Sequence, residues 1–160
     1  LLNALSDYGL NDTAYNLFES TDYASWLYPV TQGATSIWER WNGYTNELGF
    51  NGNNSMNSFN HYAYGAVASW MYSVMAGIDY DEKNPAYKNI VIKPIPDKRI
   101  KWVKASLNTR HGTVKSAWKY TEKNIEYNIT IPSGATADVT IDGETHRLGA
   151  GQYIFEGKLV

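Results

Sequence analysis

The sequence contains no cysteine, which excludes disulfide-framed folds and thiolate-bound zinc or iron–sulfur centres. Only 5 prolines and 13 glycines occur among 160 residues, so collagen-like and low-complexity chains are also excluded. No apolar run approaches the ~18–20 residues of a transmembrane helix, and we expect no membrane span. Neither a start methionine nor a secretory signal precedes the apolar segment 1–5. We therefore expect a fragment of a longer protein, whose compartment the sequence leaves open.

Charge is scarce in the first half of the chain and mostly of one sign. Residues 1–78 carry 6 acidic side chains against a single base, Arg40, whereas residues 79–160 carry 10 acidic and 13 basic side chains. One basic stretch, 98–104, surrounds Trp102 and is compatible with a nucleic-acid-binding face. Such lysines more often protect a strand edge from unwanted pairing. With a net charge of −2 and a pI near 5.9, no nucleic-acid partner is expected.

Aromatic side chains are abundant: 13 tyrosines, 6 tryptophans and 4 phenylalanines. A flat ring can stack on the C–H face of a sugar while its polar edge forms hydrogen bonds. The same side chains are equally suited to a large hydrophobic core. Composition alone does not separate the two interpretations.

The pattern of residues 1–78 is helical. A helix over 1–8 is expected to end at Gly9, and a second one, carrying Ala14, Tyr15, Leu17 and Phe18, to be capped by Asn11 or Asp12. A turn-rich passage through Pro29 and Gly33 precedes a short predicted helix over 34–41. Residues 42–57 are expected to form a loop, and the strongest helix covers 58–77. These helices have too few partners to bury their apolar faces, which predicts self-association of the fragment or exposed apolar surface.

The apolar period changes to two after residue 79. Alternation predicts strands over 114–120, 125–131 and 137–141, with a last strand at 152–156. Short strands at this spacing indicate a β-sandwich. The predicted organisation is a helical domain over 1–78, a linker over 79–87 and an all-β domain over 88–160.

The first candidate site is the polar and aromatic passage 32–42. Glu39 lies between Trp38 and Trp41, next to Arg40 and just after a glycine-bearing turn. A carboxylate in such surroundings is suited to acid–base catalysis. The alternative is an exposed helical glutamate that pairs with a neighbouring side chain.

The second candidate passage is 57–65. Asn57 or Ser58 is expected to cap the long helix, which would place His61 in its first turn. An imidazole there can exchange hydrogen bonds with sugar hydroxyls, although spacing alone favours a buried histidine bonded to a backbone carbonyl. Asn60 is either a second sugar contact or a loop anchor. The other two histidines, His111 and His146, stand apart, which argues against a metal site.

These two passages resemble the bacterial α-L-rhamnosidases of glycoside hydrolase family 78. The similarity rests on Gly33-Ala34-Thr35-Ser36-Ile37-Trp38-Glu39-Arg40-Trp41 and Asn60-His61-Tyr62-Ala63-Tyr64-Gly65, supported by Met75-Ala76-Gly77-Ile78 and by the passage 87–94. The resemblance implies the last helices of an (α/α)₆ barrel followed by a C-terminal antiparallel β-sandwich. A full barrel of a dozen helices needs on the order of 200 residues or more, so most of it lies outside this sequence.

The resemblance also implies roles. The family hydrolyses terminal α-L-rhamnosides with inversion and without a metal or cofactor, and its substrate is a rhamnose-containing carbohydrate. Glu39 would be the general base, His61 would bind rhamnose hydroxyls, and Trp38, Trp41 and Asn60 would be further sugar contacts. The general acid lies upstream in the family, so the fragment by itself is expected to be inactive.

Two departures and two alternatives accompany this hypothesis. Many members have Trp-Asp where this chain has Trp41-Asn42, and Tyr-Pro-Ser-Trp where it has residues 23–26, Tyr-Ala-Ser-Trp. The chain could instead belong to another (α/α)₆ inverting glycosidase, or be a non-catalytic carbohydrate-binding β-sandwich that exposes Trp102 or Trp118. The parity that Trp118 shares with Val114 places Trp118 in the core and leaves Trp102 open.

Overall fold

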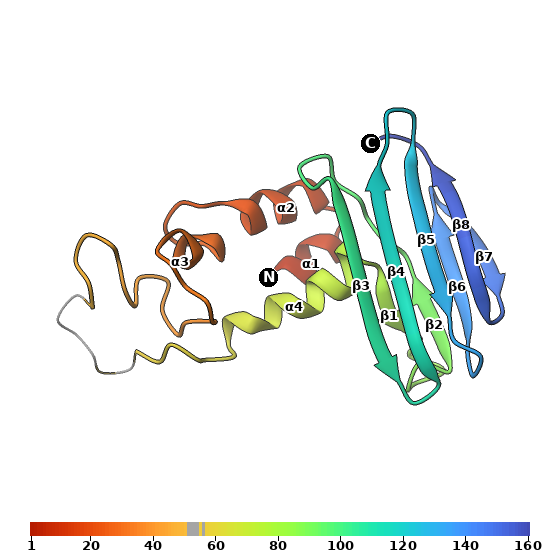
Figure 1. Ribbon diagram of the computed structural model, residues 1–160, viewed down its shortest axis with the longest axis horizontal. Coiled ribbons are helices and arrows are strands. Elements are labelled where there is room, and N and C mark those ends of the chain that lie inside the picture. Colours follow the sequence, from red (N-terminus) through yellow and green to blue (C-terminus); the bar gives the residue numbers. More distant parts are fainter. Residues whose placement is uncertain (51–54, 56) are drawn as a thin grey trace. The chain divides into compact units, whose positions relative to one another are not determined.

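The computed structural model describes residues 1–50, 55 and 57–160, which form two compact units, Leu1–Ala68 and Ser69–Val160 (Figure 1). A small helical part is followed by a sheet-rich part, which confirms the predicted fold class. Strand β1 (Ile78–Tyr80) runs across the boundary placed at residue 78 and into the predicted linker over 79–87. The domain limits read from the sequence stay a prediction. Nowhere in the described ranges is a helix both long and apolar enough to cross a membrane.

The first unit begins with two short helices that follow the predicted pattern. Helix α1 (Leu2–Asp7) ends before Gly9, whose φ of +77° is the left-handed conformation that suits a glycine after a helix. Helix α2 (Asn11–Glu19) buries Ala14 and Tyr15. The predicted cap is wrong, because the N-cap position of α2 is Leu10, which makes no side-chain cap hydrogen bond.

Three predictions about residues 27–63 are wrong. Helix α3 (Leu27–Thr31) occupies part of the expected turn passage, with Pro29 inside it. The expected helix over 34–41 is absent from that fully described stretch, and the long helix begins at Tyr64 instead of Ser58. The missing helix over 34–41 and the late start of the long helix have one cause. Backbone groups of residues 37–39 bond to those of 58–61, so they are not available for helical hydrogen bonds.

The long helix itself is built from three consecutive pieces. They are a 3₁₀ turn η1 (Tyr64–Ala66), one turn of α-helix α4 (Val67–Trp70) and a π-helical turn η2 (Met71–Met75). Gly77 follows with a φ of +73°, close to the predicted end. A Cβ atom at Gly77 would lie 2.0 Å from the backbone nitrogen of Pro94, so only glycine fits there.

The second unit consists of two four-stranded sheets with the orders β1-β2-β6-β7 and β3-β4-β5-β8 (Figure 1). The further strands are β2 (Asn89–Ile92), β3 (Trp102–Thr109), β4 (Gly112–Tyr120), β5 (Ile125–Ile131), β6 (Thr136–Ile141), β7 (Glu144–Leu148) and β8 (Gly151–Gly157). The four strands predicted from alternation are β4, β5, β6 and β8. All neighbouring strands are antiparallel except β2 and β6, which run parallel.

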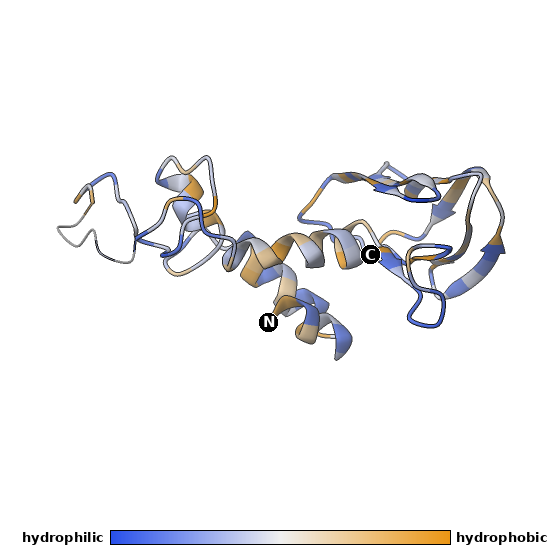
Figure 2. Cartoon of the chain, turned by 90° about the horizontal axis from the view of Figure 1, so that it is seen from below, coloured by the Kyte–Doolittle hydropathy of each residue, from blue (hydrophilic) through white to orange (hydrophobic). Residues whose placement is uncertain are grey.

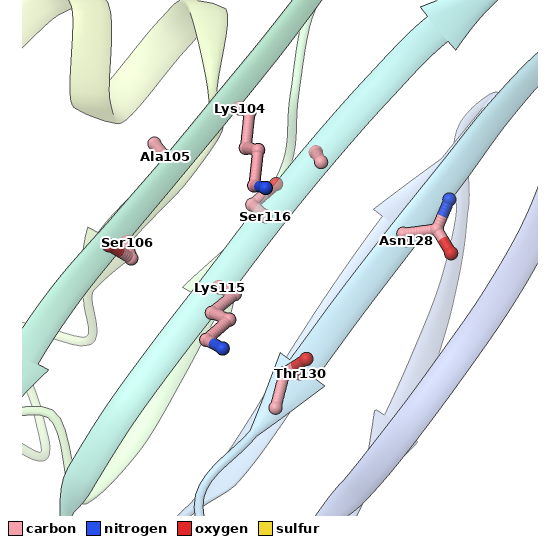
Figure 3. A pocket seen from close by; sticks show the side chains of 8 residues that line it. Lys104, Ala105, Ser106, Lys115, Ser116, Asn128 and Thr130 are labelled. Carbon is pink, nitrogen blue, oxygen red and sulfur yellow. The ribbon is translucent and has the colours of Figure 1, made fainter.

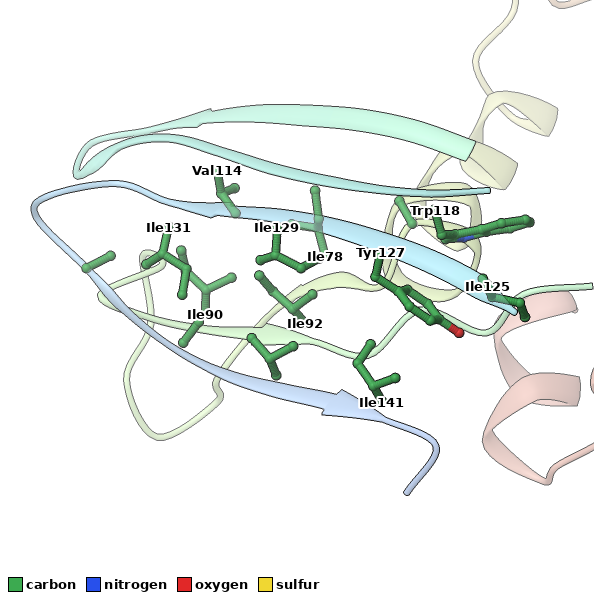
Figure 4. Close-up of a cluster of buried hydrophobic side chains, with 14 residues drawn as sticks. Ile78, Ile90, Ile92, Val114, Trp118, Ile125, Tyr127, Ile129, Ile131 and Ile141 are labelled. Carbon is green, nitrogen blue, oxygen red and sulfur yellow. The ribbon is translucent and has the colours of Figure 1, made fainter. Parts of the chain in front are cut away.

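The core of the second unit lies between the two sheets. Hydrophobic and hydrophilic residues alternate along the strands (Figure 2). Buried positions alternate with less buried ones in β4, β5 and β6, so one face of each sheet is turned to the core. The labelled side chains of Figure 4 fill the space between them, among them Ile90, Ile92, Val114, Trp118 and Ile129. Trp118 is 1% exposed, as its parity with Val114 predicts.

Strand β4 also binds the C-terminal end of the helix within the second unit. Trp118 donates its indole N–H to the carbonyl oxygen of Met75 at 2.7 Å, and the Ser116 hydroxyl donates to that of Ala76 at 2.6 Å. The last carbonyls of a helix lack partners within the helix itself. Two buried side chains of the sheet therefore satisfy the helix end.

Candidate active site

The two passages singled out in the sequence lie side by side in the first unit. The backbone N–H of Glu39 donates to the carbonyl of Ser58 at 2.9 Å, and the N–H of His61 donates to the carbonyl of Ile37 at 2.8 Å. The hydroxyl of Ser36 donates to the carbonyl of Phe59 at 2.5 Å. Residues 36–39 and 58–61 are thus held next to each other although about twenty positions separate them.

The carboxylate of Glu39 is half-buried and held at one oxygen. The N–H of Ser58 donates to Oε2 of Glu39 at 2.7 Å, so the same two residues bond through backbone and side chain. No described cation forms an ion pair with Glu39, and Oε1 has no hydrogen-bond donor among the described residues. One oxygen is anchored and the other stays available to a ligand or water.

His61 is held by its own short loop. Its ring Nδ1 accepts a hydrogen bond from the N–H of Ala63 at 3.2 Å, and its ring stacks on Tyr62 with centroids 5.6 Å apart. Since Nδ1 is an acceptor, the proton of a neutral ring is on Nε2, which can then donate to a ligand. His61 precedes the first helical residue, Tyr64, so the prediction that it lies in the first turn of the helix is wrong.

His61 lines an open hollow of about 540 Å³ in the first unit. The other lining residues are Ile37, Asn60, Tyr62, Gly65 and Ala66. Asn60 is both on this wall and bonded through its N–H to the hydroxyl of Ser58 at 3.2 Å. Glu39 does not line this hollow; the structure places it on the neighbouring segment, where Ser58 connects it to the loop of His61.

The two tryptophans flanking Glu39 are engaged in aromatic packing. Trp38 is 7% exposed and meets Phe59 edge-to-face with centroids 5.1 Å apart. Trp41 stacks on Tyr64 at 3.6 Å, and its other neighbour is Trp26. Both indoles thus pack against other aromatic rings, and sugar contacts by Trp38 and Trp41 stay a prediction.

Asn57 and Ser58, expected from the sequence as helix caps, connect loops instead. The buried amide of Asn57 donates to the carbonyl of Gly43 at 2.9 Å. A Cβ atom at Gly43 would lie 2.5 Å from Oδ1 of Asn57, so a larger residue there would displace the Asn57 side chain. The pair joins the loop after Trp41 to the segment that carries Ser58 and His61.

A second hollow, of about 410 Å³, lies in the same unit. It is lined by Tyr23, Tyr28, Gln32, Asn42, Thr45, Asn46, Glu47 and Leu48. Asn42, one of the departures noted in the sequence, therefore belongs to a hollow with a different lining from that of His61. Among the described residues, no group of three or more histidine or acidic side chains is placed to hold a metal ion.

Comparison with known proteins identifies both units. Residues 1–75 match the family model of the bacterial alpha-L-rhamnosidase 6 hairpin glycosidase domain, and residues 77–154 match that of the bacterial alpha-L-rhamnosidase C-terminal domain. An alpha-L-rhamnosidase of Formosa agariphila is 41% identical over 88% of this chain, and one of Streptomyces avermitilis is 37% identical over 90%. These matches cover 15% and 14% of the two relatives, so the chain spans about one seventh of their length.

A solved structure agrees with this assignment. The Streptomyces avermitilis alpha-L-rhamnosidase complexed with L-rhamnose superimposes with a TM-score of 0.90 and 33% identity, over 99% of this chain and 17% of that protein. The two family models follow each other along almost the whole sequence. The chain belongs to the bacterial alpha-L-rhamnosidases and corresponds to the C-terminal region of these glycosidases.

Proposed function

We propose that this chain supplies the general base of an inverting glycosidase that cleaves terminal α-L-rhamnosides. The observation that carries the proposal is the bonded pair of segments 36–39 and 58–61, which puts Glu39 next to the loop of His61. The relative of known structure was solved with L-rhamnose, the sugar this site would accept.

In this mechanism Glu39 removes a proton from a water molecule through its free Oε1 while Ser58 holds Oε2. The water then attacks the anomeric carbon on the face opposite the leaving group. A second carboxylic acid, roughly 6.5–9.5 Å away in inverting enzymes, protonates the departing oxygen. That acid is supplied by a segment outside this chain, so the chain alone is inactive.

His61 and Asn60 act on the sugar rather than on the water. Nε2 of His61 can donate to a rhamnose hydroxyl, and Asn60 shares the wall of the same hollow. Trp38 and Trp41 pack against other aromatic rings next to Glu39 in the sequence, and their contacts to the sugar are part of this proposal. The segment of Ser58 would thus connect the residue that activates the attacking water, Glu39, to the residues that bind the sugar.

The test uses a chimera in which this chain replaces the matching C-terminal region of the Streptomyces avermitilis enzyme. Glu39→Gln should lower kcat on an aryl α-L-rhamnoside by about 10²–10⁴-fold. In Glu39→Ala, added azide should restore turnover by taking the place of water, with release of the β-rhamnosyl azide. The matched control, Glu47→Gln, removes an exposed carboxylate of the same unit and should keep kcat within about twofold.

Near-normal kcat in Glu39→Gln, or an α-configured azide product, would remove Glu39 from the role of base. His61→Ala should act mainly on KM, because it removes a contact made to the sugar in both ground and transition states. A panel of aryl glycosides assayed with the same chimera distinguishes rhamnose from the other sugars that (α/α)₆ inverting glycosidases accept. Faster cleavage of another sugar would favour that alternative.

A further inference from the structure

The outer face of the β3-β4-β5-β8 sheet carries a hollow built only by residues of the second unit (Figure 3). Its volume is about 440 Å³, and it is lined by Lys104, Ala105, Ser106, Lys115, Ser116, Ala117, Asn128 and Thr130. Ligand sites in proteins commonly measure ~300–1,000 Å³. The hollow is of a size that suits a small polar ligand.

The hollow arises from one small side chain in the middle of the sheet. Ala117 faces outwards, with Lys104 of β3 and Asn128 of β5 as its direct cross-strand neighbours. In the adjacent row, Lys115 stands between Ser106 and Thr130. Longer polar side chains therefore surround a methyl group, and the register of three strands makes a basin with hydroxyl, amide and ammonium groups on its rim.

Two lysines at this basin lack a counter-charge. Lys104 and Lys115 are exposed, and no ion pair within the described chain involves either of them. Lys119 on the same face differs, because its Nζ lies 3.0 Å from Oε1 of Glu126. Lys104 and Lys115 occupy diagonal positions, which in antiparallel strands are roughly 7–8 Å apart. A carboxylate or sulfate lodged between them would relieve the repulsion of the two ammonium groups.

An exposed indole extends the same face. Trp102 lies two residues before Lys104 on β3, so both side chains point to one side of the sheet. It is 65% exposed, whereas Trp70 and Trp118 of the same unit are 1% exposed. An indole in water next to a polar basin is suited to stack on the C–H face of a sugar ring.

We propose that this face binds an acidic oligosaccharide, such as a chain containing uronic acids. One ring places its carboxylate between Lys104 and Lys115 and its hydroxyls against Ser106, Asn128 and Thr130. The neighbouring ring stacks on Trp102, which lies two residues before Lys104 on β3. The β-sandwich thereby holds an acidic glycan while cleavage takes place in the other unit, and the binding does not depend on the roles given to Glu39 and His61.

Nucleic acid fits this face less well. A phosphate backbone is held by many basic groups along a track, and aromatic platforms take successive bases. Here the face offers only two unpaired lysines and one indole, and an acidic pair, Glu126 and Glu156, stands at opposing positions of β5 and β8. Glu126 is neutralised by Lys119 and accepts a hydrogen bond from Asn128 at 2.9 Å, so the basin offers no continuous basic track. A short acidic sugar matches the number and spacing of these groups.

The experiment titrates tetragalacturonate and its fully methyl-esterified form onto the 160-residue chain by isothermal calorimetry. The ester keeps the pyranose rings and removes their charges. We expect the acid to bind and the ester to bind at least about tenfold more weakly. The double variant Lys104→Gln/Lys115→Gln should weaken binding of the acid by about the same factor. Trp102→Ala should weaken binding of both forms, on the order of fivefold.

The matched control is Lys123→Gln/Lys158→Gln, which makes the same change in net charge at exposed positions outside the basin and should keep Kd within about twofold. Circular dichroism melting shows that each variant is folded before titration. Absence of binding, equal binding of acid and ester, or an unchanged Kd in the Lys104/Lys115 variant would overturn the proposal. So would equally tight binding of a thymidine oligonucleotide with a steep salt dependence.

Discussion

The two units differ in how much of their apolar surface they bury. In the second unit, 14 buried hydrophobic residues form one cluster between two sheets (Figure 4). Among the described residues of the first unit, the buried hydrophobic side chains are Leu2, Ala14, Tyr15, Trp38 and Pro29. Large hydrophobic side chains are exposed there, namely Leu1, Tyr8, Leu10, Leu17, Tyr23, Val30, Ile37, Leu48, Phe50 and Tyr62.

The difference follows from the kind of element each unit contains. Two sheets that face each other bury one side of every strand and satisfy their backbone groups in the same step. Helices α1, α2 and α3 have 6, 9 and 5 residues, and helices of that length depend on tertiary packing for their stability. The second unit closes its own core, whereas the first presents a surface suited to further helices.

The largest expected effect is obtained by separating the units. Residues 69–160 alone should unfold cooperatively in urea, with a stability on the order of 5–10 kcal/mol, because their core is complete. Residues 1–68 alone should show no cooperative transition, since their exposed side chains lack partners. Circular dichroism and binding of a hydrophobic dye measure both properties.

Dye binding and self-association of the intact chain provide the comparison for the isolated residues 69–160. It should bind the dye or self-associate in light scattering, and both signals should be absent from residues 69–160. A monomeric intact chain without dye binding, or a cooperative transition of residues 1–68, would remove the contrast between the units. Addition of upstream helices from a rhamnosidase of the family should abolish the dye signal.

The second unit (the β unit) was more predictable from sequence than the first, helical unit. In the β unit every strand buries one side, and this burial appears in the sequence as alternation. Alternation of apolar and polar residues marks β4, β5, β6 and β8, whose inner positions are almost fully buried. Four strands were not predicted. Strands β1 and β2 have only 3 and 4 residues, too few for a visible alternation. The inner positions of β3 and β7 are only half-buried and include Ala105 and His146. In the first unit, the apolar pattern of 34–41 and 58–63 reflects packing of loops, so a helical period predicted helices that do not form.

The second-largest expected effect concerns the hydrogen bond between the Trp118 indole and the carbonyl of Met75 at the end of the helix. Trp118→Phe should lower the free energy of unfolding by about 3 kcal/mol, because it leaves the buried carbonyl of Met75 without a donor and opens a void. Urea denaturation followed by circular dichroism measures the change.

The control is Trp102→Phe, which alters an exposed indole on the same sheet and should change stability by less than about 0.5 kcal/mol. Equal losses in the two variants would show that burial of the helix end does not stabilise this unit. A change of the dye signal in Trp118→Phe would instead show that the β unit has opened.

The site was predictable at the level of residue types and order, and less so in its geometry. The Trp38-Glu39 and Asn60-His61 pairs were recognisable as a motif, and the structure brings their segments together. The connection through Ser58 was not foreseeable, because a serine before an apolar run is typical of a helix cap. Loop conformations that depend on backbone bonds between distant residues leave no periodic signal in the sequence.

The smallest effect is a pH dependence that should be confined to the β unit. The guanidinium of Arg99 donates through Nε to Oδ1 of Asp97 at 2.6 Å, and this bond lowers the pKa of the Asp97 carboxyl below its usual range. A carboxyl whose folded pKa is lowered contributes stability above its unfolded pKa of ~3.9 and loses it as the pH falls through the folded pKa. Asp97→Asn should therefore cost about 0.5–1 kcal/mol at pH 6, and this difference from the unchanged protein should shrink between about pH 4 and 2. Glu122→Gln, at an exposed turn, should show no such difference in urea midpoints over the same range, and a deficit of Asp97→Asn that stays constant with pH would assign the loss to packing rather than to charge.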